Sequence, residues 1–255
     1  MKKSVKTNSS KSETSRTSVS ETGHIKNVAL FETLLAFCNG YGEDYNPANS
    51  DLLISNLQAK YDKSRQKLKV VKDTKQPYDS VVGERQMLFK PIKPYGTRVI
   101  NALIAQKAPA TVVKDARTII RKLTGKRADN TPKDDSEQNQ ISVSQQSFDR
   151  LVDNFEELVV LAQTEGTYNP NEADLKTTAL QSYLDSLNAI NTRVRNALVP
   201  YSKALIARDK ELYDSEIGLV DLAFEVKKYI KSVFGASSRE YRQISGLRFT
   251  KPNKD

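Results

Sequence analysis

Tryptophan is absent from this sequence of 255 residues, and the turn-forming residues are scarce, with ten glycines and nine prolines. So few turn residues disfavour a many-stranded β-sandwich and suit helices joined by few turns. A hydrophobic fraction of 38% is ordinary for a globular chain, and the length allows one or two domains. We therefore expect an all-α protein.

Long apolar runs are also missing, so no segment approaches the length of a membrane span. Residues 1–24 contain eleven Ser or Thr residues and, as large apolar residues, only Val5 and Val19. Such a composition cannot offset the entropy of ordering, and it predicts a disordered tail. Because no apolar stretch follows the initial lysines, the tail does not resemble a secretory signal. We expect no membrane association and a cytoplasmic location.

Histidine and cysteine each occur once. His24 falls at the end of the predicted tail, which leaves no histidine for a general base or a metal cluster. Cys38 has apolar neighbours and predicts a packed thiol in a reducing compartment. Neither a glycine-rich phosphate loop nor the Glu-x-x-His pairs of di-iron bundles occur. The sequence predicts no enzyme, no metal and no cofactor.

The chain contains an internal repeat whose offset is 123 residues from the Tyr-Asn-Pro turns onward and differs by one or two residues near the ends of the copies, where Phe31 matches Phe155 and Gly125 matches Gly246. Matched pairs include Tyr45 and Tyr168, Asn46 and Asn169, Leu57 and Leu180, Pro77 and Pro200, and Arg85 and Arg208. We name residues 25–127 copy 1 and residues 147–250 copy 2. Residues 1–24 form the tail, residues 128–146 an acidic and polar linker, and residues 251–255 a C-terminal tail. This organisation predicts a tandem duplication of a four-helix unit.

The second helix of each copy is predicted to be long. Apolar residues recur alternately four and three positions apart and stay in phase across Pro77 and Pro200. A kinked helix explains this better than a stop, and two helices meeting at the proline are the alternative. The first helices are expected at Val28–Cys38 and Phe148–Gln163.

Several repeated residues have a structural interpretation. Asn46 and Asn169 precede proline and predict a turn, with a twin ligand site as the alternative. Gly125 and Gly246 are expected as left-handed helix caps. Arg85 and Arg208 fall on the apolar seam of the long helices, where a charge needs a buried carboxylate or a route to solvent, and we expect them to fix helix register.

The segments FETLLAFCNGYGEDYNP and REYRQISGLRFTKP, together with the two-copy layout, resemble an uncharacterised family of hypothetical proteins from Bacteroidetes bacteria. The resemblance covers about residues 27–252. It implies a bacterial cytoplasmic origin and assigns no functional residue.

The net charge of +9 is unevenly distributed, since residues 27–127 carry eighteen basic and nine acidic residues whereas residues 147–250 carry thirteen and fifteen. Seven cations crowd the long helix of copy 1: Lys60, Lys63, Arg65, Lys67, Lys69, Lys72 and Lys75. Only one of the seven aligned positions in copy 2 is basic. The shared fold therefore does not need this charge, which leaves a solvated face or an anionic partner such as nucleic acid.

Our leading hypothesis is a non-enzymatic structural or interaction protein of scaffold type, which binds a protein partner or a second copy of itself. Tyr183 and Ile190 are candidate apolar contacts for self-association. The alternative is a nucleic-acid-associated protein that binds phosphates through copy 1 and the basic tail. A carboxylate enzyme ranks third, because pairs such as Glu156 with Glu157 or Asp134 with Asp135 are adjacent and do not face each other on a helix.

Overall fold

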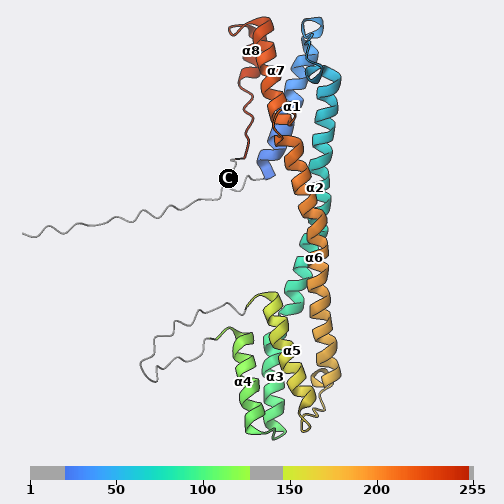
Figure 1. Cartoon of the computed structure of the whole chain (residues 1–255), viewed down its shortest axis with the longest axis vertical. Coiled ribbons are helices and arrows are strands. Elements are labelled where there is room, and N and C mark those ends of the chain that lie inside the picture. Colours follow the sequence, from blue (N-terminus) through green and yellow to red (C-terminus); the bar gives the residue numbers. More distant parts are fainter. Residues whose placement is uncertain (1–20, 127–145, 253–255) are drawn as a thin grey trace, which may run out of the picture. The chain divides into compact units, whose positions relative to one another are not determined.

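The computed structural model describes residues 21–126 and 146–252 (Figure 1). Within these two ranges all regular elements are helical, so the prediction of an all-α protein is confirmed. Copy 1 contains α1 (Glu21–Gly40), α2 (Ile54–Phe89), α3 (Ile92–Ala105) and α4 (Ala110–Thr124). Copy 2 contains α5 (Phe148–Thr164), α6 (Thr177–Tyr213), α7 (Leu219–Phe234) and α8 (Arg239–Ser245). Short 3-10 turns are η1 (Gly42–Asp44), η2 (Ser50–Leu52) and η3 (Ala173–Leu175).

The second helix of each copy is the long one, with 36 residues in α2 and 37 in α6. Pro77 and Pro200 lie inside these helices, so the prediction that the helix continues through each proline is confirmed. Pro91 ends this run in copy 1 and occupies the N-cap position of α3, where its missing N–H costs no hydrogen bond.

The predicted boundary of the N-terminal tail is wrong at its last residues. α1 begins at Glu21, and His24 is only 3% exposed. The imidazole Nδ1 of His24 lies 2.7 Å from the hydroxyl oxygen of Tyr213, near the end of α6. Local composition placed His24 in the tail, but a tertiary contact fixes it in a helix. The rest of the tail and most of the linker lie outside the described residues.

The structure divides into two compact units that differ from the two sequence copies. Of the described residues, unit 1 comprises 21–72 with 203–252, and unit 2 comprises 73–126 with 146–202. The long helices α2 and α6 contribute residues to both units. Each unit therefore combines the first helix of one copy with the third and fourth helices of the other.

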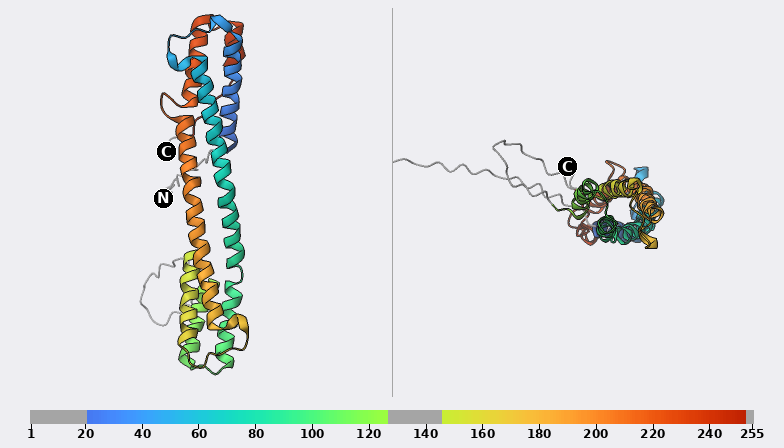
Figure 2. Two further views of the ribbon diagram at one scale, coloured as in Figure 1. Left: turned by 90° about the vertical axis from the view of Figure 1, so that its right-hand side faces the viewer. Right: turned by 90° about the horizontal axis from the view of Figure 1, so that it is seen from below.

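Unit 1 is built around α1, α7 and α8, with the first part of α2 and the last part of α6 (Figure 2). Its core joins Phe31 and Leu34 of α1 to Val226 and Ile230 of α7, all at most 1% exposed. The faces that α1 and α7 bury thus come from different copies.

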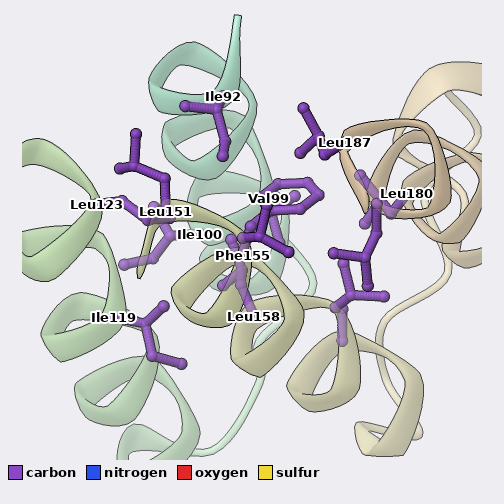
Figure 3. Close-up of a cluster of buried hydrophobic side chains, with 14 of the residues drawn as sticks. Ile92, Val99, Ile100, Ile119, Leu123, Leu151, Phe155, Leu158, Leu180 and Leu187 are labelled. Atoms are coloured by element: carbon purple, nitrogen blue, oxygen red, sulfur yellow. The ribbon is translucent and has the colours of Figure 1, made fainter. Parts of the chain in front are cut away.

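Unit 2 has the corresponding composition, with α5 from copy 2 packed against α3 and α4 from copy 1. Figure 3 shows Val99 of α3, Phe155 of α5 and Leu187 of α6 meeting in its core. Phe155 is fully buried, and its ring stands edge-on to Tyr183 at a centroid distance of 5.4 Å. Tyr183 and Ile190, our candidates for self-association, pack in this core instead. Ile190 is 4% exposed and Tyr183 is partly buried.

The Tyr-Asn-Pro turns form the same local contact in both units. The hydroxyl of Tyr45 donates to the carbonyl oxygen of Leu52, that of Tyr168 donates to the carbonyl oxygen of Leu175, and both bonds measure 2.8 Å. These tyrosines thus close the loop before each long helix.

The next residue of each turn bonds to the other copy. The backbone N–H of Asn46 donates to the hydroxyl of Tyr229 at 3.1 Å, and that of Asn169 donates to Oε1 of Gln106 at 2.7 Å. The two acceptors, Tyr229 and Gln106, are themselves 123 residues apart. Within each unit, a hydrogen bond therefore links copy 1 to copy 2, and the two bonds lie at matching positions of the repeat.

The two predicted glycine caps have different outcomes. Gly125 has φ 74° and ψ 17°, the predicted left-handed cap, and the N–H groups of Gly125 and Lys126 bond back into α4. Gly246 has φ −76° and ψ −8°, so its prediction as a left-handed cap is wrong. At this end the ammonium of Lys227 donates to the carbonyl oxygens of Ser245 and Leu247, each at 3.0 Å, and satisfies groups that the cap would otherwise serve.

We expect Gly125→Val to destabilise the protein by about 1–2 kcal/mol, because a β-branched residue is strained at positive φ. A Cβ atom there would also lie 2.8 Å from Cδ of Gln146. Gly246→Val is the matched control, and we expect a change within about 0.5 kcal/mol because its backbone is right-handed and nothing lies within 4 Å. Urea unfolding measures both free energies. Equal losses for the two variants would contradict this account.

Candidate functional site

The basic stretch of α2 begins with two lysines that are already paired. Lys60 and Lys63 place their ammonium nitrogens 2.8 and 3.0 Å from the carboxylate oxygens of Glu211 on α6. The side chains of Glu211 and Lys60 are only 6% and 14% exposed, whereas that of Lys63 is 62% exposed. Two of the seven candidate cations therefore serve a contact inside unit 1.

The pKa of Glu211 reflects this environment. Burial raises the pKa, but the hydrogen bonds and charges of Lys60 and Lys63 lower it more, so the pKa lies below its ordinary value of 4.5. A carboxyl with a depressed folded-state pKa stabilises the fold above its unfolded pKa, and this contribution is lost as the pH falls through the folded pKa.

We therefore expect Glu211→Gln to lower the unfolding free energy by about 1–3 kcal/mol at neutral pH, since it leaves two lysines without their carboxylate. The difference from the parent should shrink as the pH falls below the ordinary pKa of 4.5. Denaturant unfolding between neutral and acidic pH measures it. Glu43→Gln, at an exposed position in η1, is the control for a general charge effect. A Glu211→Gln difference that does not change with pH would contradict a pairing role.

The other five cations of the stretch have varied surroundings. Arg65 lies one turn from buried Tyr61. Hydrogen bonding with Glu32 and burial raise the pKa of the Tyr61 hydroxyl, and the charge of Arg65 lowers it by less. Lys75 is ion-paired with Asp79 one turn along α2. Lys67 is half-buried, and Lys69 and Lys72 are exposed. The seven residues thus do not form one uniform phosphate-facing surface.

The two seam arginines take different routes to accommodate their charge. The guanidinium carbon of Arg85 lies 4.0 Å from the centre of the Phe148 ring in unit 2. Arg208 is 5% exposed, and its Nε donates to Asp209 at 2.9 Å in unit 1. Both arginines are engaged in contacts within their own units.

Several ion pairs cross from copy 1 to copy 2 within one unit. They are Arg98 with Asp174, Lys122 with Glu157, Glu84 with Arg193, and the pairs of Lys60 and Lys63 with Glu211. In unit 2 the adjoining helices have opposite charge, since α4 has four basic residues and one acidic residue whereas α5 has one and four. Part of the basic excess of copy 1 is therefore matched by acidic residues of copy 2. Exposed pairs of this kind contribute little stability one by one, because solvent screens their charges.

The reactive side chains are held in contacts inside unit 1. Cys38 is fully buried, and burial raises the pKa of its thiol to about 12 despite a hydrogen bond with Tyr45. His24 bonds Tyr213, as described above, and the neighbouring Asn27 exchanges two hydrogen bonds with the backbone of Thr250. The packed thiol predicted at Cys38 is confirmed. The signal for His24 was present, because it continues the buried helical series of Asn27, Phe31, Leu34 and Cys38 at spacings of three and four.

An open groove runs between α4 and α5 of unit 2. Its volume is about 730 Å³, and it is lined by Asp115, Thr118, Ile119 and Lys122 of α4 and by Asp153, Glu156, Glu157 and Val160 of α5. Lys122 donates to Oε2 of Glu157 at 3.0 Å across the groove. Ile119 is buried and Val160 is 50% exposed. We name this surface the α4–α5 groove.

Sequence reasoning treated Glu156 and Glu157 only as a solvated pair. The signal it missed is the identical spacing of the lining residues on both helices, at i, i+3, i+4 and i+7. That spacing keeps four side chains on one helix face. The second candidate pair, Asp134 with Asp135, lies outside the described residues.

Residues 21–126 and 146–252 contain no group of three or more His, Cys, Asp or Glu side chains that could hold a metal ion. Among the helices described, none is both long and apolar enough to cross a membrane. Comparison of the chain with protein families, curated proteins and solved structures finds no match.

Proposed function

We propose that this chain is a non-enzymatic interaction protein of scaffold type. The observation that carries the proposal is the α4–α5 groove, an open surface where an exposed valine lies among charged side chains. The burial of Cys38 and His24 supports the proposal that the chain is not an enzyme. A thiol with a pKa of about 12 stays protonated at neutral pH and is a poor nucleophile, and the imidazole of His24 is buried against Tyr213.

We also propose that the architecture is a tandem duplication of a four-helix unit. The paired hydrogen bonds of the Tyr-Asn-Pro turns support it, since donors and acceptors in both units are related by the same 123-residue offset. The single buried cysteine supports the further proposal of a reducing, cytoplasmic location.

A photo-crosslinking residue placed in the groove tests the interaction role in cells. Asp153 of α5 is a suitable exposed position, and Ala29 of α1, which aligns with it, is the matched control. We expect a discrete adduct from position 153 that is absent from position 29, and whose partner rebinds the purified chain. An adduct of twice the chain mass would identify self-association. No adduct from either position, with a purified chain that stays monomeric at all concentrations, would contradict the proposal.

The alternative function is nucleic-acid binding through α2. It is favoured by the adjacent exposed cations Lys69 and Lys72, and opposed by the pairing of Lys60 and Lys63 with Glu211. A gel-shift titration against salt tests it, because phosphate contacts give a steep salt dependence. Lys69→Gln with Lys72→Gln should weaken such binding, whereas Lys203→Gln with Lys210→Gln controls for net charge. The absence of any shift with DNA or RNA at low salt would exclude this function.

A further inference from the structure

The α4–α5 groove has the geometry of a helix-binding groove. Its two walls are helix faces with the same residue spacing, and side chains at that spacing form the ridges between which a third helix packs. Ile119 and Val160 supply the apolar part of the lining. An amphipathic helix laid in such a groove would bury its apolar face there.

The charged side chains that line the groove have mainly one sign. Four lining residues are carboxylates, and Lys122 is the single lining cation. Since Lys122 already bonds Glu157, the carboxylates of Asp115, Asp153 and Glu156 leave the lining of the groove with a negative charge, most of it on the α5 wall, in a chain whose net charge is +9. Such a surface attracts cationic side chains and repels phosphate groups.

The fold does not need these carboxylates. The face of α1 that aligns with the α5 wall has Ala29, Glu32, Thr33 and Ala36 where α5 has Asp153, Glu156, Glu157 and Val160. Helix α1 packs into unit 1 with one acidic residue in this set, whereas α5 has three. On α5 itself, Glu157 pairs with Lys122, and Oδ2 of Asp153 lies 3.7 Å from the exposed guanidinium of Arg150 one turn away. The comparison with α1 shows that the fold does not require the additional charge on α5.

We propose that the α4–α5 groove binds a basic amphipathic helix of a partner protein. The apolar face of that helix packs on Ile119 and Val160, and its lysine or arginine residues pair with Asp115, Asp153 and Glu156. This assignment rests on the proposed interaction role and adds the chemical class of the partner.

The probe is a labelled amidated peptide of about 20 residues, which as a helix spans roughly 30 Å. It has leucine at i, i+3, i+4 and i+7 and lysine or arginine elsewhere, and a second peptide replaces each basic residue with glutamate. Fluorescence anisotropy with the full chain should show saturable one-to-one binding of the basic peptide alone. Raising the salt concentration to about 0.5 M should weaken binding roughly tenfold through screening.

The variants locate the binding surface. Asp153→Asn with Glu156→Gln should weaken binding roughly fivefold, as expected for two charges at the rim of an interface. Glu43→Gln with Asp44→Asn removes the same charge from exposed positions in η1 and should have no effect. Val160→Ser should weaken binding roughly threefold by removing apolar contact.

Equal effects of the two charge pairs would overturn the proposal, since they would show non-specific attraction. So would stronger peptide binding after deletion of residues 1–20, which would identify the chain's own basic tail as the occupant. A crosslinked partner at position 153 without any basic helix would leave the interaction role standing and refute only the class of partner assigned here.

Discussion

Cleavage of the chain between residues 128 and 145 is expected to leave its two halves bound to each other in one folded particle. The reason is the composition of the two cores. In unit 1, Phe31 of the first half packs in one cluster with Val226 of the second, and in unit 2, Val99 of the first half packs in one cluster with Phe155 of the second. In this structure each half buries these faces against the other half.

The ends beside the cut also stay attached. Nε2 of Gln146, which follows the cut, donates to the carbonyl oxygen of Lys122 at 3.0 Å, near the end of α4. The cut therefore removes a covalent connection between points that already touch. Cleavage therefore weakens the association of the two halves only by lowering their effective concentration, and this effect becomes important only when the protein is diluted.

The measurement uses a protease site inserted between residues 128 and 145. After cleavage, size-exclusion chromatography with light scattering should report the mass of the intact chain, while a denaturing gel shows two fragments. Denaturant should be required to separate them. The same chain left uncut is the control. Two fragments that separate in native buffer, each with a helical spectrum, would show that each copy folds as its own bundle.

The local structure could be predicted because it depends on local patterns. The apolar spacing in α6 continues through Pro200, and a single proline does not remove the burial that this spacing provides. The turn after Tyr45 followed from Asn before proline. In both cases the residues that determine the structure are neighbours in the sequence.

The partners of the helices could not be predicted from the repeat. Because the two copies have matching patterns, the buried faces of α3 and α4 suit α5 of the other copy as well as α1 of their own. Internal similarity alone therefore cannot separate two self-contained bundles from two mixed units. The spacing of His24 with Asn27 and Phe31 could have placed it on a helix, but its partner Tyr213, 189 residues away, could not be predicted from that spacing. The α4–α5 groove was missed for this reason too, since its walls come from different copies.

The side chain of Phe155 is fully buried in the core of unit 2. We expect Phe155→Ala to lower the unfolding free energy by about 3–5 kcal/mol, through lost transfer energy and the cavity left behind. Hydrogen exchange should show where protection is lost. Although Phe155 belongs to copy 2, peptides from α3 and α4 in copy 1 should exchange faster, because these helices share its core. Peptides from α7, also in copy 2, should keep their protection because α7 packs in the core of unit 1.

Phe31→Ala is the matched variant, since Phe31 aligns with Phe155 and is 1% exposed in the core of unit 1. Its loss should expose α7 and α8 of copy 2 and spare α3 and α4 of copy 1. The two variants should therefore show opposite patterns of hydrogen exchange, and in each the lost protection should extend into the copy that does not contain the substitution. If Phe155→Ala instead loosened α5 and α7 together and left α3 protected, cooperative unfolding would follow the copies, and the mixed units would not be the folding units of this protein.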